Sequence, residues 1–194
     1  MPRGPRLGIL GGTFDPFHNG HLVAACEARH QLGLDRVVLV VANRPWQKEA
    51  GREITSGEDR FAMVKAGTAG VAGVEASTIE IDRGGLTYTF DTVEALTATE
   101  PGAEIVLIIG TDVAAELGTW HRVDELRSAV SLGVVSRDGD AAPGLLGWRV
   151  TPVTMPALAI SSTDIRQRLA DGRPIEGLVP AAVVKEIRER RLYP

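Results

Sequence analysis

The sequence of 194 residues is poor in several residue types whose abundance would define a class of protein. Its single cysteine, Cys26, excludes an intrachain disulfide framework and a cysteine-rich zinc site. Lysine is also scarce, because only Lys48, Lys65 and Lys185 contribute to the 21 basic residues. Aromatic residues make up 5% of the chain. Of the 21 basic residues, the other 18 are arginines.

Positive charge does not dominate this chain. The 21 Lys and Arg residues stand against 25 Asp and Glu residues, which gives a formal net charge of −4. Proteins that bind duplex DNA or RNA rely on clustered cations that face the phosphates. We therefore expect no nucleic-acid partner. A small phosphorylated ligand needs only a few local cations, and the net charge does not exclude one.

Long hydrophobic runs are missing as well. The longest apolar segments, residues 37–42 and 105–109, are much shorter than the ~20 residues that a membrane-spanning helix needs. The apolar stretch at residues 7–10 is too short for the core of a signal peptide. We therefore expect a cytoplasmic protein with no membrane partner. The sequence is compatible with a homo-oligomer and does not determine the number of subunits.

Short β-rich segments alternate with helical patterns along the chain. We expect strands over residues 7–10, 36–41, 74–81, 104–109, 131–135 and 149–153, and helices over residues 21–32, 56–69, 90–97, 161–170 and 180–192. Strands that are apolar on both faces, as at residues 37–41, are typical of parallel sheets covered by helices on each side. The pattern predicts an α/β fold: a doubly wound, mostly parallel Rossmann-like sheet with helices on both faces, in a single domain over residues 1–194.

A glycine-containing segment links the first expected strand to the first expected helix. It reads Gly11-Gly12-Thr13-Phe14-Asp15-Pro16-Phe17-His18-Asn19-Gly20-His21. Ligands of open α/β sheets bind beyond the carboxyl ends of the strands, and a helix N-terminus there attracts phosphate. The spacing is neither that of a P-loop nor that of the G-x-G-x-x-G dinucleotide fingerprint. A different phosphate-binding arrangement is therefore indicated.

Two histidines stand at the start of this helix. His18 and His21 are three residues apart, so both rings can lie on one side of the helix entrance and donate hydrogen bonds to phosphate oxygens. For either histidine alone, a polar turn that leads into a helix is an alternative. A zinc site with Cys26 as the third ligand has no standard spacing and no obvious fourth ligand. We therefore expect no metal held by protein side chains alone.

A second helix entrance near the C-terminus also carries anion donors. The segment reads Ile160-Ser161-Ser162-Thr163-Asp164-Ile165-Arg166. Its hydroxyls, its free N–H groups and Arg166 one turn inside the helix together form a candidate anion site. Taken alone, the segment is explained better by an ordinary capped helix. Together, the two entrances favour a nucleotide polyphosphate as the ligand.

Both segments resemble motifs of one enzyme superfamily. Residues 11–21 resemble the signature of nucleotidyltransferases that carry a (His/Thr)-x-Gly-His motif, and residues 160–166 are similar to their ISSTxxR-type motif. Four further features resemble the nicotinate-mononucleotide adenylyltransferase branch, namely Lys48, Tyr88-Thr89-Phe90-Asp91-Thr92, Gly110-Thr111-Asp112 and Trp120. The resemblance covers about residues 7–193. One departure is that the Pro-His-Lys of the family's loop reads Pro45-Trp46-Gln47-Lys48 here.

The resemblance implies transfer of the adenylyl group of ATP to nicotinate mononucleotide, with Mg²⁺ bound mainly through the ATP phosphates. It assigns catalytic roles to His18, His21, Arg166 and Lys48. It assigns ATP contacts to Gly11, Gly12, Thr13, Phe14, Gly20, Gly110, Asp112, Ile160, Ser161, Ser162 and Thr163, and substrate contacts to Asp15, Tyr88, Thr89 and Trp120.

Two alternatives remain open from the sequence. The acceptor can be another phosphorylated compound, such as nicotinamide mononucleotide or phosphopantetheine, although phosphopantetheine gives no reason for a ring-stacking Trp120. The chain can also be a non-catalytic nucleotide-sensing module, which the presence of His18, His21 and Arg166 disfavours. Individual residues have simpler explanations too: Asp15 as a turn residue, Asp112 as a helix cap and Trp120 as a packing residue.

Overall fold

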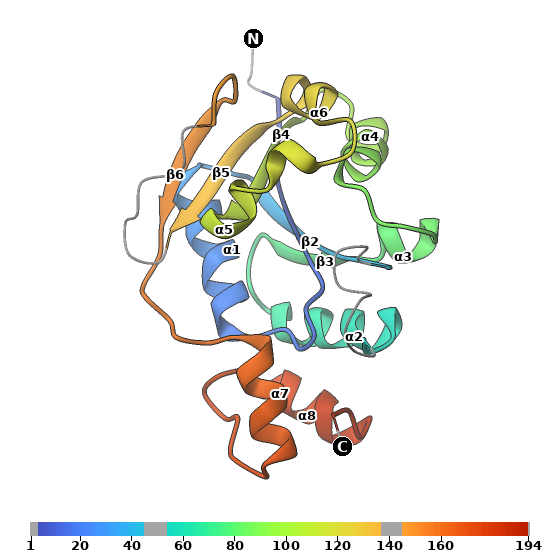
Figure 1. The fold of residues 1–194 in the computed structure, drawn as a ribbon, viewed down its shortest axis with the longest axis vertical. Coiled ribbons are helices and arrows are strands. Elements are labelled where there is room, and N and C mark those ends of the chain that lie inside the picture. The colour runs from blue at the N-terminus through green and yellow to red at the C-terminus, as the bar shows by residue number, and fades with distance from the viewer. Residues whose placement is uncertain (1–3, 45–53, 137–144, 194) are drawn as a thin grey trace.

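A computed structural model describes residues 4–44, 54–136 and 145–193 of the chain. Strands and helices alternate along most of it (Figure 1). In chain order they are β1 (Arg6–Gly12), α1 (Asn19–Gln31), β2 (Arg36–Val41), α2 (Gly57–Thr68), β3 (Val74–Ser77), α3 (Ile79–Arg83), α4 (Thr89–Thr99), β4 (Glu104–Gly110), α5 (Thr111–Ala114), a 3₁₀-helix η1 (Leu117–Thr119), α6 (Val123–Ala129), β5 (Ser131–Ser136), β6 (Val150–Thr154), α7 (Ser162–Ala170) and α8 (Ala181–Glu189).

The described strands form one parallel sheet in the order β3-β2-β1-β4-β5-β6. β1 is central: Gly8 pairs with Val37 of β2 on one side and with Val106 of β4 on the other. The strand order reverses between β1 and β4, and in such sheets the crevice beyond the carboxyl ends at that point binds ligands. The predicted doubly wound α/β fold is confirmed.

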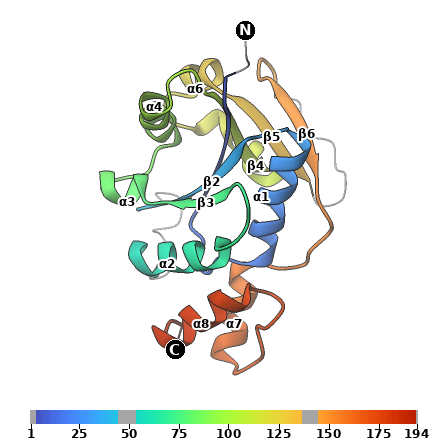
Figure 2. The ribbon, with the colours of Figure 1, turned by 180° about the vertical axis from the view of Figure 1, so that it is seen from behind.

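Alternate residues of the central strands enter two cores, one on each face of the sheet. Val37 and Leu39 pack with α1, α2, α7 and α8, whereas Val38 and Val40 pack with α4, α5 and α6. Figures 1 and 2 show α1 on one side of the strands and α4 and α6 on the other, with α7 and α8 beyond the carboxyl end of the sheet. Because both faces are covered, neither set of side chains meets water, which explains the continuous apolar runs in the sequence.

Several predicted boundaries differ from the structure. The strand expected over residues 74–81 ends at Ser77, because the Ser77 hydroxyl accepts a hydrogen bond from the N–H of Ile79 (3.2 Å) and α3 begins there. Hydroxyl side chains compete with a strand ladder in this way. The first strand is longer than predicted and includes Gly11 and Gly12. The short helices α5 and α6 were not predicted from the sequence.

The C-terminal helices lie at the carboxyl end of the sheet, next to the start of α1 (Figures 1 and 2). The N–H of Asn19 donates to the carbonyl oxygen of Leu178, which joins α1 to the segment before α8. α8 packs on α2 through the buried side chains of Val183, Val184 and Ile187. Among the described residues, no helix combines the length and the apolar character needed to span a bilayer.

Candidate functional site

A cavity of about 700 Å³ opens where the strand order reverses. Its walls come from the end of β1 and the loop after it, the first turn of α1, the end of β4 with α5, the segment after β6, and the start of α7. The lining residues are Leu10, Gly11, Gly12, Thr13, Phe14, Asp15, His18, Gly20, His21, Ala24, Ile109, Gly110, Thr111, Asp112, Val113, Val135, Met155, Leu158, Ile160, Ser161, Ser162, Thr163 and Arg166. Every residue predicted to contact ATP therefore lines one cavity.

His18 and His21 are stacked at the start of α1. Their ring centroids are 3.6 Å apart with an interplanar angle of 17°. His18 is the N-cap residue, and its backbone N–H donates to Nδ1 of His21 (3.2 Å). An accepting Nδ1 carries no proton, so the neutral ring of His21 has its proton on Nε2, where it is a donor.

Two phenylalanines hold the ring of His21 in place. The ring of Phe14 meets it edge-on, with the ring centroids 5.0 Å apart, and the ring of Phe17 is stacked against it, with the centroids 5.6 Å apart. Phe17 is fully buried and lies against Gly67 of α2, where a Cβ atom would come within 2.6 Å of the Phe17 ring. The glycine therefore permits the close approach of α2 that supports this aromatic cluster.

The start of α7 faces the same cavity and is tied to the loop after β1. Ser161 caps the helix, since its hydroxyl accepts from the N–H of Asp164 (3.1 Å). The Ser162 hydroxyl donates to the carbonyl oxygen of Pro16 (3.0 Å). The guanidinium of Arg166 donates to the carbonyl oxygen of Asp15 (2.6 Å) and to the hydroxyl of Thr163 (3.2 Å). Two helix N-termini and a cation thus converge on one space.

The third wall is the end of β4. A Cβ atom on Gly110 would lie 2.5 Å from Oδ1 of Asp112, so only glycine lets the Asp112 carboxylate fold back at this position. Asp112 is in the first turn of the short helix α5. The carboxylate therefore lies at the rim of the cavity, across the strand reversal from the two histidines.

Four predicted site residues are not brought into this cavity by the described structure. Lys48 lies outside the described residues. Tyr88, Thr89 and Trp120 are described, but none of them is among the lining residues. The Tyr88 ring instead lies 4.6 Å from the ring of His121, the residue next to Trp120. Tyr88 and His121 thus form an aromatic pair at the N-terminus of α4, while Trp120 packs against the core that contains Phe90.

Comparison with known proteins agrees with this architecture. The family model for cytidylyltransferase-like proteins matches residues 9–168. This chain belongs to the cytidylyltransferase-like family. A relative from Corynebacterium kroppenstedtii, named "Probable nicotinate-nucleotide adenylyltransferase", is 46% identical over 97% of this chain and 91% of its own length. A relative of the same name from Streptomyces coelicolor is also 46% identical, over 95% of this chain and 98% of its own.

A solved structure shares the fold of this cytidylyltransferase-like chain. The Plasmodium falciparum nicotinic acid mononucleotide adenylyltransferase complexed with NaAD has a TM-score of 0.79 and 16% identity, and the match covers 97% of each chain. At this identity the likeness concerns the fold alone. The sheet and helices of this chain are thus arranged as in that solved structure.

Sequence reasoning missed several residues that shape the site of this cytidylyltransferase-like protein. Met155 and Leu158 line the cavity from the segment after β6, a place that the rule for carboxyl ends of strands could have indicated. Arg60 and Tyr193 contact the loop after β1 from far along the chain. No local sequence pattern marks either contact.

The described residues contain no group of three or more His, Cys, Asp or Glu side chains that could hold a metal ion. Among the lining residues, Asp15 and Asp112 carry carboxylates. Asp15 accepts a hydrogen bond from Tyr193, while Asp112 lies at the rim. Burial raises the pKa of the Cys26 thiol, which disfavours the thiolate that zinc requires. This donor set fits a hard cation that is carried mainly by phosphate oxygens and water.

Proposed function

We propose that this chain transfers the adenylyl group of ATP to nicotinate mononucleotide, producing nicotinate adenine dinucleotide and pyrophosphate. The observation that carries the proposal is the convergence of His18, His21 and Arg166 with two helix N-termini in one cavity at the strand reversal. The names of full-length relatives at 46% identity support the same reaction. The donor set is suited to a triphosphate, because each element offers N–H groups to anionic oxygens.

The reaction needs no nucleophile from the protein. An oxygen of the acceptor phosphate attacks the α-phosphorus of ATP, a new P–O bond forms, and the bond to the β-phosphate oxygen breaks to release pyrophosphate. The protein contributes by placing both substrates and by stabilising charge in the transition state. Positioning alone can supply about 7–11 kcal/mol of the barrier.

We assign the roles in this reaction as follows. His21 donates from Nε2 to the phosphate oxygens around the α-phosphorus, and the stacked His18 donates to the α- and β-phosphates beside it. Arg166 and Lys48 hold the leaving pyrophosphate and the acceptor phosphate. Asp112 accepts from the ribose hydroxyls of the adenosine. When bound, Mg²⁺ supplies positive charge that offsets the charge of the triphosphate.

The proposed acceptor site lies outside this cavity, at the start of α4 and at Trp120. Tyr88, Thr89 and Trp120 would contact the pyridine ring and its carboxylate from outside the described cavity. The mononucleotide would then reach from this group to the α-phosphorus with its own phosphate. We place the activity in the cytoplasm, where ATP is available, and propose no nucleic-acid partner, because the formal net charge is −4.

The test is a pyrophosphate-release assay on the purified protein. ATP and Mg²⁺ are supplied with nicotinate mononucleotide, nicotinamide mononucleotide or phosphopantetheine in separate reactions. We expect the fastest release with nicotinate mononucleotide and formation of the matching dinucleotide by mass spectrometry. Release with phosphopantetheine alone would reassign the acceptor. Nucleotide binding without release in any reaction would favour the sensing module.

A further inference from the structure

The C-terminal tail contacts one residue of the cavity lining through a single side chain. After α8 the backbone turns twice, with φ of 53° at Arg191 and 58° at Tyr193. The O–H of Tyr193 then donates a 2.6 Å hydrogen bond to Oδ1 of Asp15, a residue 178 positions earlier. The tail thus contacts the loop between β1 and α1 directly.

Asp15 occupies a central place in that loop. It is 1% exposed, lines the cavity and stands three residues before His18. Its carbonyl oxygen accepts from Arg166, and its carboxylate accepts from Tyr193. Two C-terminal segments therefore hold one residue, the first through its backbone and the second through its side chain.

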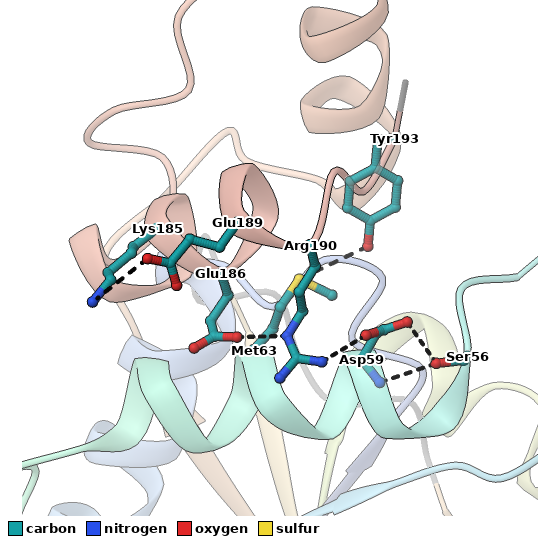
Figure 3. Close-up of polar contacts among 8 residues, drawn as sticks. All are labelled: Ser56, Asp59, Met63, Lys185, Glu186, Glu189, Arg190 and Tyr193. Atoms are coloured by element: carbon teal, nitrogen blue, oxygen red, sulfur yellow. Dashed lines mark hydrogen bonds and ion pairs between the residues drawn. The ribbon is translucent and has the colours of Figure 1, made fainter.

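The tail itself is firmly placed. The guanidinium of Arg190 donates to Asp59 of α2 (2.9 Å) and to Glu186 of α8 (2.7 Å), as Figure 3 shows. The hydroxyl oxygen of Tyr193 lies 4.0 Å from the sulfur of Met63. Burial and the neighbouring Asp15 raise the pKa of Tyr193 above its ordinary value, so the phenol keeps the proton that it donates.

We propose that Tyr193 is a positioning residue for adenylyl transfer: its O–H fixes the Asp15 carboxylate and, through it, the loop that carries His18 and His21. The inference rests on the proposed function and adds to it a residue that lies outside both sequence motifs. A hydrogen bond to a carboxylate is shorter and stronger than a neutral one, so it suits this task. Displacing a reacting group by about 1 Å can cost about 10²-fold in rate.

The primary test is Tyr193→Phe, which keeps the ring and removes only the donor. We expect kcat to fall about 10-fold while KM for nicotinate mononucleotide changes less than about twofold, because the lost donor acts on the loop that carries the histidines and not on Tyr88, Thr89 or Trp120. Asp15→Ala, which removes the acceptor, should also lower kcat. The double variant should be no slower than Asp15→Ala, because both changes remove the same contact.

Arg190→Gln is the matched control. It removes the contact between α8 and Asp59 and leaves the Tyr193 to Asp15 pair in place. We expect its kcat to remain within about twofold of the unmodified protein. If Arg190→Gln reproduced the loss, the effect would come from tail docking in general, and the proposal would be wrong. Circular dichroism and thermal midpoints establish that each variant is folded at the assay temperature.

Three further results would overturn the positioning role. The first is an unchanged kcat in Tyr193→Phe, and the second is a kcat of the double variant that equals the product of the two single losses. The third is a change in Tyr193→Phe that is confined to KM. Absence of pyrophosphate release by the unmodified protein would instead reject the proposed function. In that case the positioning role of Tyr193 is tested by the affinity for α,β-methylene-ATP, measured by calorimetry. We expect Tyr193→Phe to weaken it several-fold, and an equal affinity would reject the positioning role independently of catalysis.

Discussion

The guanidinium of Arg60 donates a 2.9 Å hydrogen bond to the carbonyl oxygen of Thr13, so a buried cation on α2 holds the loop that carries the candidate phosphate-binding residues. Arg60 is 1% exposed and also donates to the carbonyl oxygens of Asn43 (3.1 Å) and Thr55 (2.8 Å). It thereby joins the segments that follow β1 and β2 to the segment that precedes α2.

Arg60→Met should destabilise the fold substantially. Each buried carbonyl that loses its donor costs about 1–3 kcal/mol, and we expect a total loss of about 3 kcal/mol in the free energy of unfolding. Urea denaturation measures it. Arg173→Met, at an exposed ion pair with Asp171, is the control and should change stability by less than about 0.5 kcal/mol. Equal midpoints for the two variants would contradict the structural role of Arg60.

The stacked histidines predict a loss of rate rather than of binding alone. His18→Ala and His21→Ala should each lower kcat by at least about 10²-fold, by analogy with removing one oxyanion donor. Steady-state kinetics with ATP and nicotinate mononucleotide measures the effect. His30→Ala, at the exposed far end of α1, should leave kcat unchanged. A change confined to KM would mean that the histidines bind only the ground state of the nucleotide.

Glu80 predicts a stability that depends on pH. The residue is 5% exposed, its carboxylate accepts from the Thr92 hydroxyl (2.5 Å), and burial raises the pKa of that carboxylate above the ordinary value of 4.5. The folded state then binds more protons than the unfolded chain above pH 4.5, so the free energy of unfolding decreases as the pH rises through the folded pKa.

Glu80→Gln should remove this dependence, because the amide oxygen can still accept from Thr92 and carries no charge. We expect the variant to gain stability relative to the unmodified protein as the pH is raised from about 4.5 to 8, measured by urea midpoints. Glu94→Gln, on the exposed face of α4, should run parallel to the unmodified protein. A Glu80→Gln curve parallel to that control would refute the assignment.

Replacing glycine by alanine should affect substrate binding at Gly11 and stability at Gly67. A Cβ atom on Gly11 meets no atom within 4 Å, so Gly11→Ala should fold normally but raise KM for ATP, since Gly11 lines the cavity. A Cβ atom on Gly67 would lie 2.6 Å from Phe17 and 2.9 Å from Val183. Gly67→Ala should therefore lower the free energy of unfolding by about 1–3 kcal/mol. Thermal midpoints and steady-state kinetics together separate the two effects, and a reversed pattern would contradict the packing described.

Local features of the sequence predicted the elements that depend on near neighbours. The apolar run at residues 37–41 indicated a strand covered on both faces, and Ser161 indicated a helix start. Both are confirmed, since strand periodicity and capping involve residues only a few positions apart. The prediction of a strand as far as residue 81 was wrong, and its cause is also local. The Ser77 hydroxyl accepts a hydrogen bond from the N–H of Ile79, and the strand ends there.

The sequence by itself determined the alternation of strands and helices and the two segments, 11–21 and 160–166, that carry the candidate hydrogen-bond donors to phosphate. Only the tertiary structure decided that these segments face one cavity, because their meeting depends on strand order and on contacts such as that of Ser162 with Pro16. The same holds for the bonds of Arg60 to Thr13 and of Tyr193 to Asp15. Contacts between residues far apart in the chain arise from packing of the whole sheet and its helices, and no local pattern encodes them.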